Sequence, residues 1–570
     1  MIPMDMMGPI MFGALVIFML IGYPVAFSLA AVGLTFAFIA IETGFPNFQF
    51  SLMQAMPERV FGIMSNDLLL AIPFFTFMGA ILERCGLAED MLEGMGQLFG
   101  PVRGGLAYAV IIVGAILGAI TGTVAASVIA MGLISLPIMM RYGYNMRLAT
   151  GVIAASGTIT QLIPPSLVLV VLADQLGKSV GDMYAGAIGA SIVQVALFCG
   201  FIALVSVVKP DAMPPLPRED LTMKGWPLYR RILLGMIPSF VLIFLVLGTI
   251  LMGLATPTEA GAMGAVGAIV LAVLQHKACS RRALIAARIG GVVALVLAFP
   301  GLVIWLDERA PAGLLAAANG FMGMVKTPLF FVFYLSLAAV LLEAAIIVEL
   351  RKLISQGMDS TMRITAMVIF ILIGSSLFTL VFRGVQGDVW IEGLLTSLPG
   401  GVTGFLIFVN IFVFVLAFFL DFFEIAFIII PLLAPVAAKL GIDLIWFGVL
   451  LGANMQTSFM HPPFGFALFY LRGIAPKEVK SSDIYWGAIP WVILQLILVA
   501  ILVFCPGLVT AFLDKEKVID TNKVRIEVPV DSTDPSRGGA KGAPGSTDED
   551  DPTKALERAL RGSEAKQEPR

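Results

Sequence analysis

The sequence has little histidine, cysteine or charge, and each shortage excludes a class of protein. It contains 2 histidines and 4 cysteines in 570 residues, and charged residues make up 13% of the chain. A haem-bearing redox subunit needs axial ligands, and one of the two histidines, His276, falls in a predicted loop. The cysteines are scattered, without the spacing of a metal or disulfide site. A formal net charge of −3 argues against nucleic acid as a partner.

Two further sequence signals are missing. No segment has the form G-x-x-x-x-G-K-[ST], so an ATP-driven pump with a P-loop is excluded. The N-terminus has neither a basic region nor an A-x-A cleavage site, so we expect that no signal peptide is removed. The first apolar run is therefore interpreted as the start of the first membrane span.

What the chain does contain is apolar sequence. Apolar residues make up 59% of it, far more than in a soluble domain. Charge-free runs long enough to cross a bilayer as a helix recur throughout. These runs include Gly186–Val208, Ile232–Thr258, Ile364–Phe382, Leu444–Leu471 and Ile484–Leu513. The sequence therefore predicts an all-α polytopic membrane protein.

The N-terminal part predicts three spans, an interfacial helix and a hairpin. Met6–Ile41 is long enough for two spans with a bend near Gly22–Pro24, and Leu68–Leu82 is a third. Leu87–Val102 has acidic residues on one side and apolar residues at helical spacing on the other, as in a helix that lies in the interface. Gly104–Met140 is too long for one straight span and rich in small residues. We interpret it as a re-entrant helical hairpin.

The basic residues predict an orientation. Lys and Arg gather in the loops Lys209–Arg231 and Lys277–Arg288, which two spans separate, so both loops lie on the cytoplasmic side. The remaining loops fit this scheme if Gly393–Ala438 is a second re-entrant hairpin, entering from the opposite face. Arg59 and Lys439 then fall on the outer side, against the bias.

An internal repeat relates the two halves of the chain. A proline-containing stretch, a Pro-Pro pair and an Asp-led helix start recur in the same order, and the interval from the first proline to the pair is equal in both halves. The matched segments are Leu136–Asn145 with Ala434–Asp443, Pro164-Pro165 with Pro462-Pro463, and Asp182–Ile188 with Asp483–Ile489. Each half therefore has a hairpin followed by a helix broken at Pro-Pro, and the predicted topology inverts the second half.

Polar residues precede each proline pair, as in "GTITQLIPPS" (Gly157–Ser166) and "MQTSFMHPPFG" (Met455–Gly465). Broken backbone inside a membrane is tolerated only where it is buried in protein or lines a polar cavity. Inverted repeats with discontinuous helices are typical of secondary transporters. Helix ends there offer carbonyls to cations and N–H groups to carboxylates. The alternative is that the prolines and small residues only help membrane helices to pack.

The chain resembles the large membrane subunit of the tripartite ATP-independent periplasmic (TRAP) transporters, in the ion transporter superfamily. The segments with this resemblance are "IGYPVAFSLAAVGL" (Ile21–Leu34), "IPFFTFMGAILERCG" (Ile72–Gly86), "GAITGTVAAS" (Gly118–Ser127), "GTITQLIPPS", "ATPTEAGAMGAVGA" (Ala255–Ala268) and Gly441–Gly465. The resemblance implies sodium-driven uptake of an organic acid by an elevator mechanism. It also implies a small membrane subunit and an extracytoplasmic solute-binding protein as partners, and the bacterial inner (plasma) membrane as the location.

Together, these features predict six parts of the chain. They are 1–103, N-terminal scaffold spans and an interfacial arm helix; 104–208, the first transport repeat; 209–282, scaffold spans; 283–363, an inserted pair of spans; 364–513, a second scaffold span and the second transport repeat; and 514–570, a disordered polar tail. The inserted pair and the tail are departures from the family. A third departure is "HPPFG" in the second half, where the family usually has "TPP-x-G".

We predict one sodium site between the first hairpin tip and the first break, and a pseudo-symmetric site in the second half. Sodium is expected near Thr123, Thr158 and Thr160, and near Asn454 and Thr457, as a coupling ion and not as a resident cofactor. The candidate residues for sodium or substrate are Thr121, Gly122, Thr123, Ser127, Ser156, Gly157, Thr158, Thr160, Pro164, Pro165, Asp421, Glu424, Asn454, Gln456, Thr457, Ser458, His461, Pro462 and Pro463.

Three of these candidates have two readings. Asp421 and Glu424 lie in the predicted second hairpin, and intramembrane carboxylates are usually functional, although a structural role is the alternative. His461 could donate to substrate or simply be packed. Glu259 is expected to cap a helix start. No catalytic residue is predicted. An intramembrane protease needs a nucleophile with its base or paired acids, whereas Asp421 and Glu424 are three residues apart on one hairpin and no matching motif occurs elsewhere. A passive channel, or a sodium- or proton-coupled organic anion carrier that works without a binding protein, remains the rival interpretation.

Overall fold

The computed structural model describes residues 6–46, 48–217, 219–221, 225–276, 279–305, 312–461 and 465–513, with side chains described throughout these ranges except at 234 and 295–327. The predicted tail 514–570 and the pair Pro462-Pro463 lie outside the described residues. Within the described ranges the chain folds into helices, and no strand is present. Nine described helices are long and apolar enough to cross a membrane, or up to 11 spans if each of two bent pairs counts as one. The predicted all-α polytopic membrane fold is confirmed.

The predicted bend between the first two spans lies where two residues stop the helix. α1 (Met7–Ile21) ends at Gly22, whose φ of 90° lies in the left-handed region, and Pro24 directly precedes α2 (Val25–Glu42). Glycine adopts that conformation without steric cost, and proline cannot continue the hydrogen-bond ladder of the preceding helix. α2 packs along α17 (Val348–Gly384).

The next spans complete the part that we call the scaffold, which comprises α1–α6 and α12–α17. The short α3 (Phe50–Met53) and α4 (Met56–Met64) meet α5 (Asp67–Arg84) at a bend of 47°. α5 packs against α14 and α17. The remaining scaffold elements are α12 (Trp226–Ile243), the π-helical η4 (Phe244–Gly248), α13 (Thr249–Leu251), α14 (Pro257–Gln275), α15 (Arg281–Trp305) and α16 (Ala312–Ile346).

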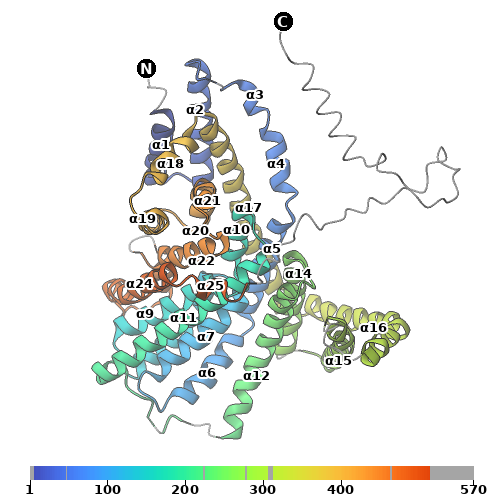
Figure 1. Ribbon diagram of the computed structural model, residues 1–570. Helices are drawn as coiled ribbons and strands as arrows, with labels where there is room; N and C mark the ends of the chain where they lie inside the picture. Colours follow the sequence, from blue (N-terminus) through green and yellow to red (C-terminus); the bar gives the residue numbers. More distant parts are fainter. Residues whose placement is uncertain are drawn as a thin grey trace, which may run out of the picture. The chain divides into compact units, whose positions relative to one another are not determined.

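Glu259 has the capping role that the sequence predicts. Its side chain accepts from the Thr256 N–H at 2.9 Å, while the Glu259 N–H donates to the Thr256 hydroxyl at 3.3 Å. This reciprocal pair satisfies two of the donors that a helix start leaves free. The predicted inserted spans correspond to α15 and α16, which pack on one another and contact α14. Figure 1 shows the two helices beside α14.

The predicted interfacial helix is α6 (Leu87–Phe99). Its apolar residues, among them Met91 and Leu92, are buried, and the helix packs against α7 and α12. On its other side Asp90 and Glu93 pair with Arg231 of α12, at 3.6 and 2.7 Å. The apolar side is therefore covered by neighbouring helices of this chain. Its role as an arm remains a prediction.

The first re-entrant hairpin is formed by α7 (Gly105–Thr121) and α8 (Val124–Arg141). The two-residue turn contains Gly122 with a φ of 61°, a conformation that favours glycine. The open ends of the two arms lie together, because the backbone N–H of Leu106, at the start of α7, donates to the Tyr144 hydroxyl beyond the end of α8 at 3.4 Å. The two helices therefore run in opposite directions, as a hairpin requires.

The first broken helix follows the hairpin. α9 (Met146–Thr158) continues as a 3-10 turn, η2 (Ile159–Gln161), and the helix restarts only at α10 (Leu167–Leu176), which α11 (Val180–Val208) follows. Pro164 and Pro165 lie in the gap and lack the N–H groups that would continue the ladder. The Ser166 hydroxyl then caps α10 by accepting from the Val168 N–H at 3.1 Å.

The second half repeats this order with one difference at its start. The sequence predicts the second hairpin from Gly393, but Gly393 lies in α18 (Gly387–Thr396), and the first arm is α19 (Gly401–Leu416). The turn between them bends the chain by 119° and contains Gly400 and Gly401, both with positive φ. The predicted boundary was therefore about two helical turns too early. Pro399, Gly400 and Gly401 mark the bend in the sequence, and this turn signal was overlooked. The second arm consists of α20 (Phe422–Glu424), the π-helical η6 (Ile425–Ile429) and α21 (Ile430–Lys439).

The second broken helix matches the first element by element. α22 (Leu444–Met455) continues as the 3-10 turn η7 (Gln456–Met460) and restarts at α23 (Phe466–Ile474). α24 (Ser481–Phe504) and the short α25 (Gly507–Thr510) complete the described chain.

The two halves interlock around the breaks. The second arm of the first hairpin, α8, contacts α23, which follows the second break. The equivalent contact in the other half joins α10, which follows the first break, to η6 and α21 of the second hairpin. α9 packs along α24, and α22 packs against both α10 and α11. Figure 1 shows α9, α11, α22 and α24 near one another on the left side of the molecule. We call α7–α11 and α18–α25 together the transport unit.

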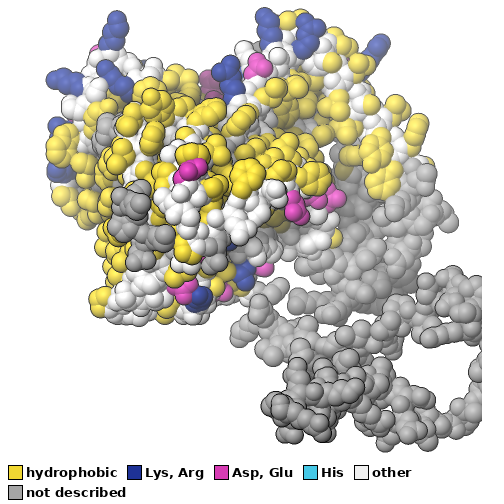
Figure 2. All heavy atoms as spheres, turned by 90° about the horizontal axis from the view of Figure 1, so that it is seen from above, with side chains coloured by type: hydrophobic (Ala, Val, Ile, Leu, Met, Phe, Trp, Pro, Cys, Tyr) yellow, Lys and Arg dark blue, Asp and Glu magenta, His cyan; other side chains and the backbone are white. Residues whose placement is uncertain are grey.

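Hydrophobic side chains cover much of the outer surface. In Figure 2 they occupy most of the described face, while Lys and Arg gather mainly along one margin. Large aromatic residues are exposed on it, including Phe61 at 72% and Phe469 at 71%. An apolar surface this extensive would make a soluble monomer aggregate, but it is what lipid-facing helices require.

Candidate functional site

The first break gathers three buried hydroxyls whose acceptor oxygens remain usable. Ser156, Thr158 and Thr160 are fully buried. Each donates its single hydrogen to the carbonyl three residues earlier, at 2.8, 2.9 and 2.8 Å respectively. A hydroxyl that donates in this way keeps its lone pairs as acceptors. The predicted residues therefore present oxygen atoms and not O–H groups to any ligand.

The second break has the same local geometry. Thr457 donates to the Asn454 carbonyl at 2.8 Å, and Ser458 donates to the Met455 carbonyl at 2.7 Å. When the proline pairs are superposed, Ser458 and Met455 fall on Thr160 and Gly157, which make the same contact in the first half. The sequence repeat is thus a repeat of hydrogen bonds as well.

The first hairpin tip lies against the first break. Thr121 and Ser127, on either side of the turn, share a hydrogen bond of 3.0 Å between their hydroxyls. A Cβ added to Gly118 would lie 2.8 Å from Thr160 Cγ2, so the hairpin arm and the break touch without room for a side chain. A Cβ on Gly122 would lie 3.9 Å from the Pro165 carbonyl oxygen. The structure therefore brings the predicted tip and the predicted break together.

The second hairpin tip also meets its break, but through aromatic rings. The buried His461 stacks on Phe418 with ring centroids 4.0 Å apart, and Phe414 meets it edge-on at 4.7 Å. Both phenylalanines come from the end of the first arm or the turn after it. These ring contacts agree with the interpretation that His461 is packed in the protein interior. Its predicted role toward substrate remains a prediction.

Asp421 and Glu424 form a reciprocal cap at the start of the second arm. Asp421 Oδ1 accepts from the Glu424 N–H, and Glu424 Oε2 accepts from the Asp421 N–H, each at 2.9 Å. This arrangement satisfies backbone donors at a helix start inside the membrane, where water cannot. The contacts therefore give both carboxylates a structural role. That either carboxylate binds sodium or substrate remains a prediction.

This arrangement predicts a charge-independent role for Asp421. In Asp421→Asn the amide oxygen can still accept from the Glu424 N–H, whereas Asp421→Ala leaves that donor unpaired, at a cost of about 1 kcal/mol or more. We expect the alanine variant, and not the asparagine variant, to lower the thermal unfolding midpoint of the detergent-purified protein. Equal loss in both variants would show that the charge, and not the cap, is what matters.

Buried amides that the sequence analysis overlooked connect the two halves at the breaks. Gln495 of α24 donates to the Thr158 hydroxyl at 2.8 Å. Gln194 of α11 donates to Gln456 Oε1 at 2.5 Å, and Gln456 donates back at 3.3 Å. A signal was available, because extending the repeat "DMYAGAI"/"DIYWGAI" without a gap aligns Gln194 with Gln495.

Asn410 is a further amide without an earlier prediction. The Asn454 amide nitrogen donates to the backbone carbonyl of Asn410 at 2.7 Å and to the Asn410 side-chain oxygen at 2.9 Å. The two asparagines therefore link the first arm of the second hairpin to the second break. A hollow of about 260 Å³ reaches these two asparagines, and Ile407, Phe414 and Val499 are among its apolar lining residues.

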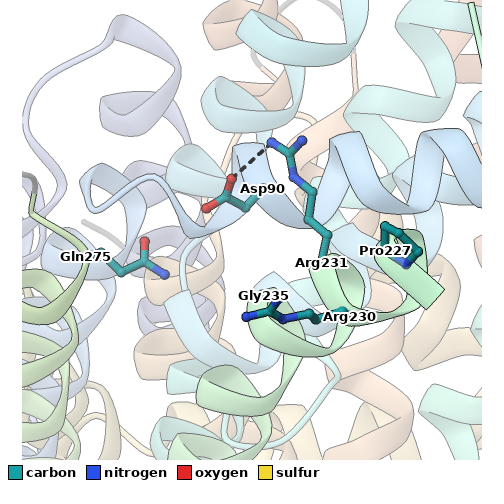
Figure 3. A pocket seen from close by; sticks show the side chains of 6 residues that line it. All are labelled: Asp90, Pro227, Arg230, Arg231, Gly235 and Gln275. Carbon is teal, nitrogen blue, oxygen red and sulfur yellow. Dashed lines mark ion pairs between the residues drawn. The ribbon is translucent and has the colours of Figure 1, made fainter. Parts of the chain in front are cut away.

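A larger hollow lies away from the breaks. It has a volume of about 450 Å³ and is lined by Asp90, Pro227, Arg230, Arg231, Gly235 and Gln275. Figure 3 shows Arg231 pointing toward Asp90 from α12, with the ion pair marked. None of the predicted site residues lines it, so it does not contribute to the candidate site.

The two breaks carry neutral oxygen donors. Among the described residues, no group of three or more His, Cys, Asp or Glu side chains could hold a metal ion. The breaks instead present hydroxyl, amide and backbone oxygens, the ligand types that hard cations prefer. Neutral oxygens can bind a single positive charge without the burial of a compensating carboxylate.

Comparison with known proteins agrees with this architecture. The family model described as "Tripartite ATP-independent periplasmic transporter, DctM component" matches residues 12–348 and 317–508. The C4-dicarboxylate TRAP transporter large permease protein DctM of Rhodobacter capsulatus is 26% identical over 523 residues, which cover 88% of this chain and 97% of that protein. The 2,3-diketo-L-gulonate TRAP transporter large permease protein YiaN of Escherichia coli (strain K12) is 23% identical over 458 residues, 80% of this chain and 89% of that protein.

A third relative is longer than this chain. The sialic acid TRAP transporter permease protein SiaT of Haemophilus influenzae (strain 86-028NP) is 23% identical over 503 residues, which cover 87% of this chain and 66% of that protein. Among solved structures, the YdaH transporter of Alcanivorax borkumensis aligns with a TM-score of 0.41 and 14% identity, over 80% of this chain and 88% of that one.

Proposed function

Because the chain belongs to the DctM component family of tripartite ATP-independent periplasmic transporters, we propose that it is the large membrane subunit of a sodium-coupled importer of an organic acid. It is a multi-pass protein of the bacterial inner membrane. The finer parts of the proposal are the coupling ion, the substrate class, the partners and the mechanism.

One observation supports transport at the breaks above all others. Two helices interrupted at repeat-equivalent positions are buried where the two halves interlock. Each is hydrogen-bonded by the second helix after the other break. In secondary transporters such paired discontinuous helices hold substrate and coupling ions near the membrane midplane. A helix interrupted merely to improve packing would not need an amide from the opposite half to support it.

The relatives support an organic acid as the substrate. Their names specify C4-dicarboxylate, 2,3-diketo-L-gulonate and sialic acid, and all three compounds carry a carboxylate. A carboxylate can be bound by free N–H groups at a helix start, and α10 and α23 both begin at a break. We propose that this chain binds a carboxylate-bearing substrate at the starts of α10 and α23.

Sodium is the coupling ion that the donor set favours. The lone pairs of Ser156, Thr158 and Thr160 are buried beside the first hairpin tip, and no carboxylate is needed to neutralise one charge. A second ion would bind near Asn454 and Thr457. We propose a small membrane subunit and an extracytoplasmic solute-binding protein as partners, since the family is named for a three-part system.

We further propose that the transport unit slides as a rigid body against the scaffold. In the predicted topology its two hairpins open toward opposite faces, so displacement of the whole unit would expose one ligand site alternately to either side. The two parts touch along α5, which contacts α7, α8 and α10, and along α6, which contacts α7 and α8.

The test is transport in vesicles that contain the large and small subunits. Radiolabelled C4-dicarboxylate, diketogulonate and sialic acid would be supplied with or without the proposed solute-binding protein, and with a sodium or a choline gradient. We expect accumulation above equilibrium only with both the binding protein and sodium. Full uptake of free substrate would indicate a carrier that needs no binding protein, and uptake that stops at equilibrium would indicate a channel.

A further inference from the structure

Two glutamines occupy equivalent positions in the repeat and make the same cross-half contact. Gln194 lies on α11 and Gln495 on α24, at the same distance after the Asp-led start of each helix, and both are fully buried. Each reaches the break of the opposite half: Gln495 contacts Thr158, and Gln194 contacts Gln456. Thr158 and Gln456 are themselves equivalent, because each precedes its proline pair by the same interval.

The partner residue differs between the halves, and the difference changes which atoms are satisfied. In the second half two amides face one another, and each donates to the oxygen of the other, at 2.5 and 3.3 Å. Both side-chain oxygens are therefore occupied. We call this pair closed, because neither amide oxygen is left without a hydrogen-bond partner.

In the first half the partner is a hydroxyl. Thr158 has already given its hydrogen to the Ala155 carbonyl at 2.9 Å, so it can only accept from Gln495. The nitrogen of Gln495 must then face Thr158, and its Oε1 is left buried with no hydrogen-bond partner in the described part of the chain. An unpaired buried amide oxygen is costly and is rarely retained without a use.

We propose that Gln495 Oε1 and Thr158 Oγ1 are sodium ligands of the first break, whereas Gln194 and Gln456 form a closed lock that binds no cation. This inference rests on the proposed sodium coupling and extends it, because it makes the two halves unequal. An amide oxygen and a hydroxyl oxygen are both neutral, hard ligands that suit such an ion. The Met460 sulfur, 3.9 Å from the Gln495 nitrogen, lies beside the donor and is too soft to compete for sodium.

Sodium binding can be measured without knowing the substrate. The detergent-purified protein would be titrated with sodium chloride at constant ionic strength, kept with choline chloride, and the thermal unfolding midpoint recorded at each step. Gln495→Met removes the oxygen at similar volume. A hydrogen-bond-strength contact to a charge is lost, so half-maximal stabilisation should need about tenfold more sodium.

A second variant protects against a folding failure at Gln495. Thr158→Val removes the other proposed ligand at nearly constant shape, and it should raise the required sodium by about the same factor. The matched control is Gln194→Met, at the equivalent position of the other half. It should lower the unfolding midpoint at every sodium concentration and leave the half-maximal sodium concentration unchanged.

The most discriminating variant gives one half of the repeat the partner residue of the other half. Gln456→Thr gives the second half the hydroxyl partner of the first, which frees Gln194 Oε1. We expect one more saturable step in sodium stabilisation than the unaltered protein shows. An unchanged titration would overturn the claim that the partner residue decides between an open and a closed amide.

The outcomes separate this inference from the function on which it rests. If the unaltered protein is stabilised equally by sodium and choline, the proposed sodium coupling fails and this inference falls with it. If the unaltered protein responds to sodium while Gln495→Met and Thr158→Val keep its titration midpoint, only the assignment of ligands is overturned.

Discussion

Crosslinking the transport unit to the scaffold through positions 66 and 174 is expected to abolish transport. The Asn66 amide, at the start of α5, donates to Asp174 Oδ1 of α10 at 2.8 Å, which is a polar contact across the proposed sliding surface. If the unit must move as a rigid body, a covalent link there holds it in one position. The variant Asn66→Cys with Asp174→Cys, in a background without the four native cysteines, would be treated with a short bifunctional thiol reagent.

The matched control links two elements inside the transport unit. Arg147 of α9 and Asp483 of α24 form an ion pair of 3.1 Å, a polar side-chain contact similar in kind and length. Arg147→Cys with Asp483→Cys, treated in the same way, should keep transport, because both positions move together. Each pair is first assayed before treatment, since Asn66 also caps α5 and its loss alone costs some stability. Full transport with both links closed would favour local gating over a moving unit.

The proline pairs show how far the sequence alone could go. A missing N–H is a local property, so Pro164-Pro165 fixed the position of the first break, and the equal interval to Pro462-Pro463 predicted the second. The break of α22 is present at the expected place, although that second pair lies outside the described residues. The length and small residues of Gly104–Met140 likewise predicted the first hairpin.

What the sequence could not supply depends on contacts between distant segments. The pairing of Gln495 with Thr158 joins residues from opposite halves, and no local pattern encodes it. Asp421 and Glu424 illustrate a different limit. Their spacing is that of a capping box, but the apolar residues around them drew attention to their charge, and only the hydrogen bonds revealed the cap.

Replacing Gly79 by alanine is expected to impair transport severely, although it adds only one methyl group. Gly79 lies in the middle of α5, and a Cβ there would be 2.1 Å from the Thr121 carbonyl oxygen and 2.9 Å from its carbonyl carbon. Those are backbone atoms at the tip of the first hairpin, so no side-chain rotation relieves the overlap. The tip must shift, and overpacking of this kind costs roughly 1–3 kcal/mol.

The same glycine lies on the surface along which the hairpin would slide, so transport should suffer more than stability. We expect the uptake rate of Gly79→Ala to fall by about tenfold or more, since each 1.4 kcal/mol added to a barrier slows a step tenfold. Gly62→Ala is the control, because Gly62 lies in the neighbouring α4 and an added Cβ there meets nothing within 4 Å. Uptake and the thermal unfolding midpoint would be measured for both. If Gly79→Ala lowers the unfolding midpoint but leaves uptake by the folded protein unchanged, the contact is only a packing contact, and α5 is not the surface along which the unit moves.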